Sequence, residues 1–209
     1  MSRVVEVEPE RLERWLTGFA ERHGPCGVSR HDTASGVLVR AEAADGATAV
    51  ATPFAHDPLG IVLVRRGGYA VAMSLAGQLR EAKVGRRHVQ SRTAAGGWSQ
   101  QRFARRRGKQ ADELVDAVVG HARRILLHDD ESPRPGSPRL PRGLVLGGDR
   151  SLVQQVVAAP ALRALHGLPV RELFDLPDPR RDVLETALRR GRSYRITVTD
   201  PPGPGAAVP

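Results

Sequence analysis

The amino-acid sequence predicts an α/β (α+β) fold in which a mixed sheet is flanked by helices. Two pairs of short apolar runs are each joined by a glycine-containing turn, which is the pattern of antiparallel hairpins. After them, a long stretch carries apolar residues at helical spacing. The remaining chain alternates short strands with helices, and such alternation is typical of a sheet covered by helices.

The first predicted helix spans residues 9–23. Pro9 suits the first helical position, and Gly24-Pro25 ends the pattern. Its apolar stripe consists of Leu12, Trp15, Leu16 and Phe19. Because these residues recur every three to four positions, they predict one buried helix face.

An antiparallel meander is predicted after this helix. The predicted strands are 36–42, 47–53, 61–65, 69–75 and one within 79–90. Asp45-Gly46 and Gly67-Gly68 are the hairpin turns, and Gly85 is a candidate bulge or break in the last strand.

A long helix starting near Gln100 and ending near Leu127 opens the second half. A buried strand at 144–146 follows, and Asp149 is expected to cap a helix over about 150–158. The last predicted elements are a short strand or turn at 170–174, a helix at 179–190 and a strand at 194–198. This order matches a ribonuclease-H-like layout. We predict a single domain over 1–199, followed by a disordered tail at 200–209. Within the domain, the segments are a helix and meander at 9–90, a glycine-glutamine loop and basic helix at 91–127, an exposed loop at 131–142 and a strand–helix half at 143–199.

The positive charge is concentrated in one segment. The formal net charge is +9. Between Arg80 and Lys109 there are ten Lys and Arg residues and one acid, Glu81, so this segment accounts for the whole excess. A confined basic segment is the footprint expected of a phosphate-binding surface. The candidate RNA-binding residues are Arg86, Arg87, Arg92, Arg102, Arg105, Arg106, Arg107 and Lys109.

Within that segment lies the stretch Gly96-Gly97-Trp98-Ser99-Gln100-Gln101, followed by the arginines. The two glycines predict a mobile or sharply turned loop, and Ser99 is a candidate N-cap for the long helix. Helical spacing then predicts one basic face made by Arg102, Arg105, Arg106 and Lys109. The sequence thus presents an uncharged polar tip, Gln100, in front of a cationic helix.

Several kinds of active site find no support. Residues 60–80 hold no Asp or Glu, which a two-metal nuclease of this fold needs. No phosphate-binding Walker loop occurs, and a triad of Ser99, Asp149 and His166 lacks the Gly-x-Ser-x-Gly elbow. His121 and His128 are better explained as surface or helix-end histidines than as zinc ligands. We therefore predict no metal and no cofactor. The single cysteine and the absence of a signal core or a long apolar run predict a cytoplasmic protein that does not enter a membrane.

Glutamine has no side-chain pKa near 7, so Gln100 is no general base. Its amide, with the loop backbone, can orient a water molecule and donate to a developing oxyanion. An amide can support hydrolysis in this way when the substrate is an already activated ester that a larger assembly holds in place.

The Gly97-Trp98-Ser99-Gln100 stretch with its arginines resembles the Gly-x-x-Gln loop of the Vms-type release-factor-like peptidyl-tRNA hydrolases, most closely their actinobacterial branch. Arg66-Gly67-Gly68-Tyr69-Ala70 and Leu146-Gly147-Gly148-Asp149-Arg150 share in the resemblance. These proteins are similar to the middle domain of eukaryotic and archaeal class I release factors. The resemblance implies a ribonuclease-H-like domain that frees nascent chains from tRNA on stalled or split ribosomes, with Gln100 as the catalytic glutamine and Gly96 and Gly97 as its hinge.

The implied partners are the large ribosomal subunit at its peptidyl transferase centre, peptidyl-tRNA and rRNA. Ser99 stands where release factors have glycine, and Gln101 is an adjacent rival for the catalytic role. Two alternatives stay open from the sequence: a tRNA 3′-end (CCA) endonuclease that uses the same loop, and a non-catalytic ribosome-binding factor.

Overall fold

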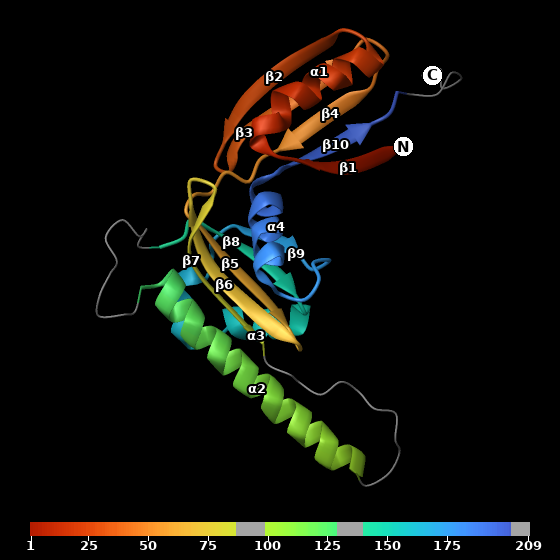
Figure 1. Ribbon diagram of the computed structural model, residues 1–209. Helices are drawn as coiled ribbons and strands as arrows, with labels where there is room; N and C mark the ends of the chain where they lie inside the picture. Colours follow the sequence, from red (N-terminus) through yellow and green to blue (C-terminus); the bar gives the residue numbers. More distant parts are fainter. Residues whose placement is uncertain (87–98, 129–139, 202–209) are drawn as a thin grey trace. The chain divides into compact units, whose positions relative to one another are not determined.

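The computed structural model describes residues 1–86, 99–128 and 140–201, with the backbone alone over residues 99–107 (Figure 1). The chain packs as two compact units. Unit 1 comprises Met1–His56 and Arg189–Pro209, and unit 2 comprises Asp57–Leu188. The single domain over 1–199 stays a prediction.

Unit 1 is a five-stranded antiparallel sheet with one helix against it. The strand order is β1-β10-β4-β3-β2. The strands are β1 (Ser2–Val7), β2 (Cys26–Thr33), β3 (Gly36–Ala43), β4 (Thr48–Thr52) and β10 (Tyr194–Thr199). A short 3-10 helix, η1 (Pro9–Arg11), leads into α1 (Leu12–His23), whose Leu12, Leu16 and Phe19 are buried as the stripe predicts.

Two strands of unit 1, β1 and β2, were not predicted from the sequence. Every residue of β2 after Cys26 is exposed, because β2 is an edge strand. An exposed edge strand needs no alternation of apolar and polar residues, so the sequence carries no strand signal there. In β1 only Val7 is buried. The pairing of β1 with β10 joins strands from the two ends of the chain.

Unit 2 contains the mixed sheet that the sequence predicts. The strand order is β7-β6-β5-β8-β9. The strands are β5 (Leu59–Arg65), β6 (Gly68–Leu75), β7 (Gln78–Arg86), β8 (Gly143–Gly148) and β9 (Val170–Leu173). β5, β6 and β7 pair in antiparallel fashion, whereas β8 and β9 run parallel to β5.

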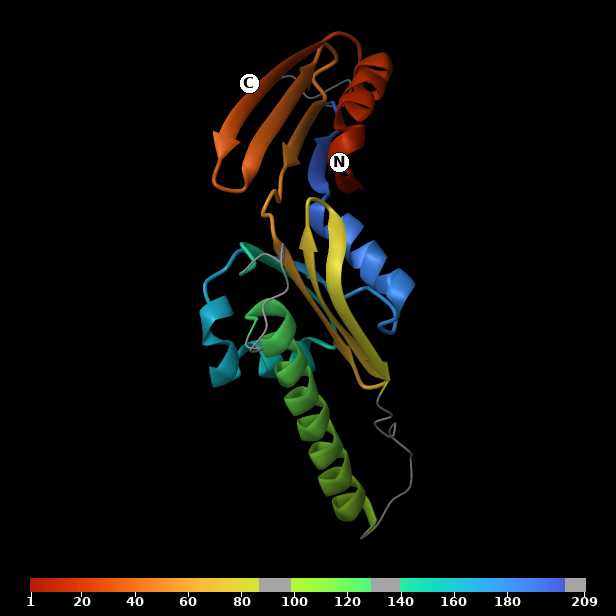
Figure 2. The same ribbon diagram turned by 60° about the vertical axis from the view of Figure 1, so that its left-hand side comes forward.

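Helices cover both faces of the mixed sheet. α2 (Ser99–Leu126), α3 (Arg150–Val157) and the 3-10 helix η2 (Pro160–Leu165) pack on the face formed by Val62, Val64 and Val71. Figure 2 shows the start of α4 (Arg181–Arg192) on the opposite side of that sheet from α2. Because both faces are covered, β5 is buried at every position from Leu59 to Val64.

Two sequence predictions are wrong. The hairpins do not form one meander, since β3 and β4 belong to the sheet of unit 1 and β5 and β6 to that of unit 2. Hairpin signals are local and do not encode which further strand pairs with each hairpin. Gly85 is also no bulge: it pairs in register with Tyr69, and the irregularity lies beside Met73 and Ser74. Most of the predicted loop at 131–142 and of the tail at 200–209 lies outside the described residues.

Two glycines end β8 because the neighbouring strands approach closely. A Cβ at Gly147 would lie 2.6 Å from the carbonyl oxygen of Leu173 on β9. At Gly148, φ is +104° and a Cβ would collide with the carbonyl oxygen of Val64 on β5. Only glycine satisfies both the backbone conformation and the space at position 148.

Gly148→Ala is therefore expected to lower the free energy of unfolding by about 3 kcal/mol or more, as measured by urea denaturation. Gly120→Ala makes the same chemical change in the middle of α2, at an exposed position where a Cβ meets no atom within 4 Å. That control is expected to stabilise the protein by about 1 kcal/mol, since alanine favours helix over glycine. Equal effects of the two substitutions on the free energy of unfolding would contradict the requirement for glycine at position 148.

Candidate functional site

One edge of the mixed sheet gathers the two glycine motifs and the last residue before the predicted glutamine loop. β5, β7, β8 and β9 end at this edge and β6 begins there, as the pairs Gly68–Arg86 and Val64–Gly148 show. We call it the loop edge. Arg65-Arg66, Gly67-Gly68 and Gly148-Asp149 lie along it, so sequence motifs about 80 residues apart meet in one place.

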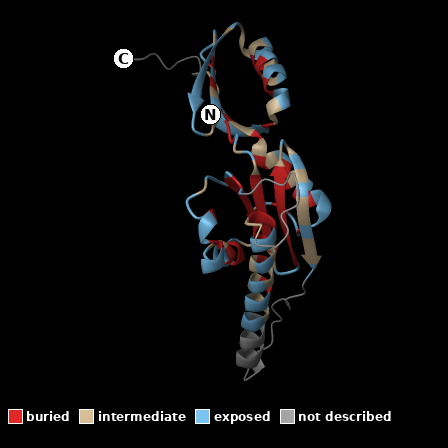
Figure 3. Ribbon diagram, turned by 90° about the vertical axis from the view of Figure 1, so that its left-hand side faces the viewer, coloured by how far each residue is buried: buried red, intermediate tan, exposed pale blue. Residues whose placement is uncertain are grey.

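The described side chains of α2 anchor the helix at its C-terminal half. Leu114, Val118, Ala122, Ile125 and Leu126 are fully buried against the mixed sheet, α3 and η2. Among the described side chains of α2, core contact starts at Ala111, and the twelve residues before it correspond to about 18 Å of backbone at the helical rise per residue. Figure 1 shows this backbone projecting past the loop edge, and Figure 3 shows exposed residues along the described part of it.

The phase of α2 separates the predicted basic positions from the buried stripe. α2 is helical from Ser99. At 3.6 residues per turn, positions 102, 105, 106 and 109 fall on the side opposite Leu114 and Val118. Position 100 falls on the same side as the buried stripe. The backbone thus places positions 102, 105, 106 and 109 on the side opposite position 100, whereas position 107 falls on the same side as position 100.

A ring stack joins α2 to the sheet beneath the projecting segment. The hydroxyl of Tyr69 on β6 and Nε2 of His121 on α2 are 2.9 Å apart, and the two rings are stacked with centroids 5.3 Å apart. The Tyr69 ring lies over Gly85 on β7, where any Cβ would collide with it. Gly85 is therefore a packing requirement, and this stack fixes α2 relative to the strand that leads into residues 87–98.

The environment of His121 favours its neutral form. Partial burial lowers the pKa of His121 below its ordinary value, and the charges of Arg124 and Lys83 lower the pKa further. Nη2 of Arg124 lies 3.5 Å from Nδ1 of His121. Because a guanidinium only donates, this contact favours the tautomer in which Nε2 donates to the Tyr69 hydroxyl oxygen. His121 is thus a half-buried structural residue and not the surface histidine that the sequence predicts.

Asp149 is held at the loop edge by the helix that follows it. Its Oδ1 accepts hydrogen bonds from the backbone N–H groups of Ser151 and Leu152 and from the Ser151 hydroxyl. Partial burial acts to raise the pKa of Asp149, but these hydrogen bonds and the charge of Arg66, whose Nε is 3.9 Å away, lower it. Asp149 therefore caps α3, as the sequence predicts.

The predicted site residues differ in how far the structure describes them. Arg87, Arg92, Gly96, Gly97 and Trp98 lie outside the described residues. α2 begins at Ser99, one residue before the predicted start near Gln100, so Ser99 is its first residue rather than its N-cap. The backbone of α2 is also described at Gln101, Arg102, Arg105, Arg106 and Arg107. Only Arg86, the last residue of β7, and Lys109 have described side chains, and both are exposed.

A model of the family described as "Actinobacteria/chloroflexi VLRF1 release factor" matches residues 57–197, which is more than half of the chain. The chain belongs to the VLRF1 release-factor family. The match begins at the first residue of unit 2 and takes in the mixed sheet, α2 and the loop edge. It confirms the actinobacterial family that the loop motif indicates, and membership makes this a release-factor-like protein. No curated protein matches the chain.

Most of unit 1 lies outside the residues that the VLRF1 family model matches. Among the described residues, no three His, Cys, Asp or Glu side chains are grouped as metal ligands would be. No helix within the described ranges is long and apolar enough to cross a membrane.

Sequence reasoning missed the Tyr69–His121 contact. The two residues are 52 positions apart, and a lone tyrosine in a strand and a lone histidine in a helix carry no pairing signal.

The free energy of unfolding is expected to decrease as the pH is lowered, because of His121. Since its folded pKa lies below the ordinary value of 6.5, the unfolded chain takes up the proton first as the pH falls. The stability contribution is present above about pH 6.5 and is lost as the pH falls toward the folded pKa. Urea midpoints measured on both sides of this window should fall less in His121→Gln, which keeps a donor for Tyr69 but does not titrate. An equal fall in both proteins would exclude His121 as the cause.

Proposed function

We propose that this protein is a cytoplasmic peptidyl-tRNA hydrolase that releases nascent chains on stalled or split ribosomes. Membership of the VLRF1 release-factor family supports a role of this kind. The observation that carries the proposal further is the projection of α2 from the loop edge. A long helix that is anchored at one end and begins with the glutamine segment can reach into a narrow RNA-walled cavity, such as the peptidyl transferase centre.

The proposed chemistry is the hydrolysis of the ester that joins the peptide to the tRNA 3′ end. Water attacks the ester carbonyl carbon, the bond to the ribose oxygen breaks, and a free peptide acid and an intact tRNA result. The Gln100 amide orients the water. The backbone N–H groups in the first turn of a helix have no partner within the helix, so those at the start of α2 can donate to the oxyanion.

The division of α2 into two sides supports a division of roles. The positions of Arg102, Arg105, Arg106 and Lys109 lie opposite the buried stripe, where they can bind rRNA or tRNA phosphates. Arg107 and Arg86, with Arg87 and Arg92, complete the proposed RNA-binding set. Gly96 and Gly97 let the segment adapt to the ribosome, and Trp98 contributes packing or stacking on a base.

Gln100→Ala is expected to reduce peptide release by about 100-fold or more while ribosome binding is retained. Gln101→Ala, one residue along the same turn, is the matched control and is expected to keep most of the activity. The assay follows the peptide and the tRNA 3′ end of ribosome-bound peptidyl-tRNA on one gel. A shortened tRNA would instead identify a 3′-end nuclease. Unchanged release by Gln100→Ala would exclude Gln100 as the catalytic residue.

Charge reversal of Arg102, Arg105 and Arg106 to Glu is expected to abolish ribosome binding together with most of its salt dependence, because these positions are proposed to displace counterions from phosphates. The control reverses Arg142, Arg163 and Arg180, three exposed arginines of unit 2 outside α2, and so makes the same change in net charge. Binding is measured by cosedimentation with ribosomes at several salt concentrations. Equal losses in both variants would show that only net charge matters.

A further inference from the structure

Unit 1 contains a groove of about 540 Å³ that the proposed hydrolase chemistry does not use. It lies between the end of β1 and one side of α1. Its lining residues are Glu6, Val7, Glu8, Arg11, Arg14, Trp15, Gly18 and Arg22. All of them precede Asp57, where the family match begins.

The acidic side chains of the groove are already paired with other arginines of unit 1. Glu6 accepts hydrogen bonds from Nε of Arg190 at 2.6 Å and from its Nη2 at 3.2 Å, and lies 3.8 Å from Arg195. Glu8 lies 4.0 Å from Arg189. These two carboxylates therefore leave the other cations of the groove uncompensated.

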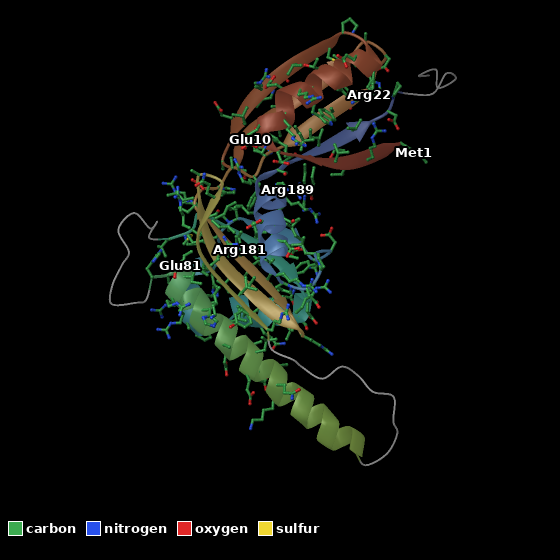
Figure 4. The ribbon with its side chains drawn as sticks, viewed as in Figure 1. Met1, Glu10, Arg22, Glu81, Arg181 and Arg189 are labelled. Atoms are coloured by element: carbon green, nitrogen blue, oxygen red, sulfur yellow. The ribbon has the colours of Figure 1, made fainter. Side chains whose placement is uncertain are left out.

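Arg11, Arg14 and Arg22 are those cations. All three are exposed, and among the residues that the structure describes none provides an ionic or hydrogen-bonding partner for their guanidinium groups. Arg14 and Arg22 lie on one side of α1, and Arg11, at the end of η1, precedes them at helical spacing. Figure 4 labels Glu10 in η1 and Arg22 in the last turn of α1.

Gly18 makes room for the cationic groove. It lies in the middle of α1 without a positive φ, so the backbone does not require glycine there. A Cβ at this position would meet only Nη1 of Arg22, at 3.4 Å. The side chain of Arg22 thus lies back along α1 over the bare backbone of Gly18, toward Trp15. Glycine in a helix interior lowers the stability of the helix by about 1 kcal/mol relative to alanine. The space that Gly18 leaves for the groove explains why glycine occurs at this position.

Trp15 supplies the aromatic surface. Its ring stacks on the buried Phe19 with centroids 5.6 Å apart and an interplanar angle of 13°. This packing fixes the ring in orientation while its remaining surface lines the groove. A fixed tryptophan beside three unpaired guanidinium groups combines the two elements that bind single-stranded nucleic acid: stacking for a base and cations for phosphates.

We propose that this groove binds single-stranded RNA, with phosphates on Arg11, Arg14 and Arg22 and a base on Trp15. Unit 1 then provides an RNA contact that is separate from the glutamine segment and extends the proposed function without depending on it. Three uncompensated cations alone would suit an acidic peptide equally, but the tryptophan surface between them favours a ligand with both phosphates and flat bases.

The test uses the full chain with Trp98→Phe, which leaves Trp15 as the sole tryptophan. Titration with an oligouridine of about ten nucleotides is expected to quench Trp15 fluorescence saturably. Arg14→Glu on this background is expected to weaken binding about tenfold and to reduce the salt slope by about one. The matched control is Arg40→Glu, since Arg40 is an exposed residue of β3 between the core residues Val39 and Ala41 and therefore faces away from α1. It should change affinity less than about twofold.

Gly18→Ala separates binding from folding. It is expected to raise the melting temperature, because alanine favours helix, yet to weaken the quenching, because the methyl group fills the groove beneath Arg22. Absent quenching, equal losses in Arg14→Glu and Arg40→Glu, or displacement of the RNA by a polyglutamate peptide at equal concentration would each overturn the proposal. The signal reports RNA at Trp15 itself, so it is independent of whether Gln100 is needed for release.

Discussion

The burial of one side of α2 against the mixed sheet is the constraint on which the candidate site depends. Leu114, Val118 and Ile125 are fully buried, and the contact of His121 with Tyr69 adds a polar, directional link at the same interface. Among the described residues of α2, this interface involves the C-terminal half of the helix, from Ala111 onward, and Figure 1 shows the backbone of its first turns beyond the sheet. A site at the start of α2 is thus positioned by contacts far from it.

The loop edge shows why the glycine motifs occur where they do. Gly147 and Gly148 let β8 approach β9 and β5, and Gly85 leaves space for the Tyr69 ring. Each glycine is explained by packing, with no catalytic role required. Asp149, the carboxylate that ends β8, is likewise engaged as the cap of α3. The packed sheet therefore supports the site, whereas the proposed chemistry belongs to the segment that leads into α2.

The charges of the protein are distributed between the two units in different ways. Within unit 1, Glu6 and Glu10 pair with Arg190 and Arg192, which ties the C-terminal end of α4 to the start of the chain. These pairs neutralise the acids and leave Arg11 of η1 and Arg14 and Arg22 of α1 without partners among the described residues. The positive excess of the sequence lies in the segment from Arg80 to Lys109, which includes the start of α2. Net charge alone therefore does not indicate the groove of unit 1.

The sequence by itself determined the local elements and the family. The α1 stripe, both hairpins, the Asp149 cap and the long helix follow from short-range patterns, and the glycine-glutamine stretch with its arginines indicated the VLRF1 family that the match over residues 57–197 confirms. Only the tertiary structure decided which strands share a sheet, because β1 pairs with β10 across almost the whole chain and edge strands such as β2 need no apolar pattern. It also decided the lowered pKa of His121 and the grouping of Arg14, Trp15 and Arg22 around Gly18, since burial and the pairing of nearby acids depend on residues distant in sequence.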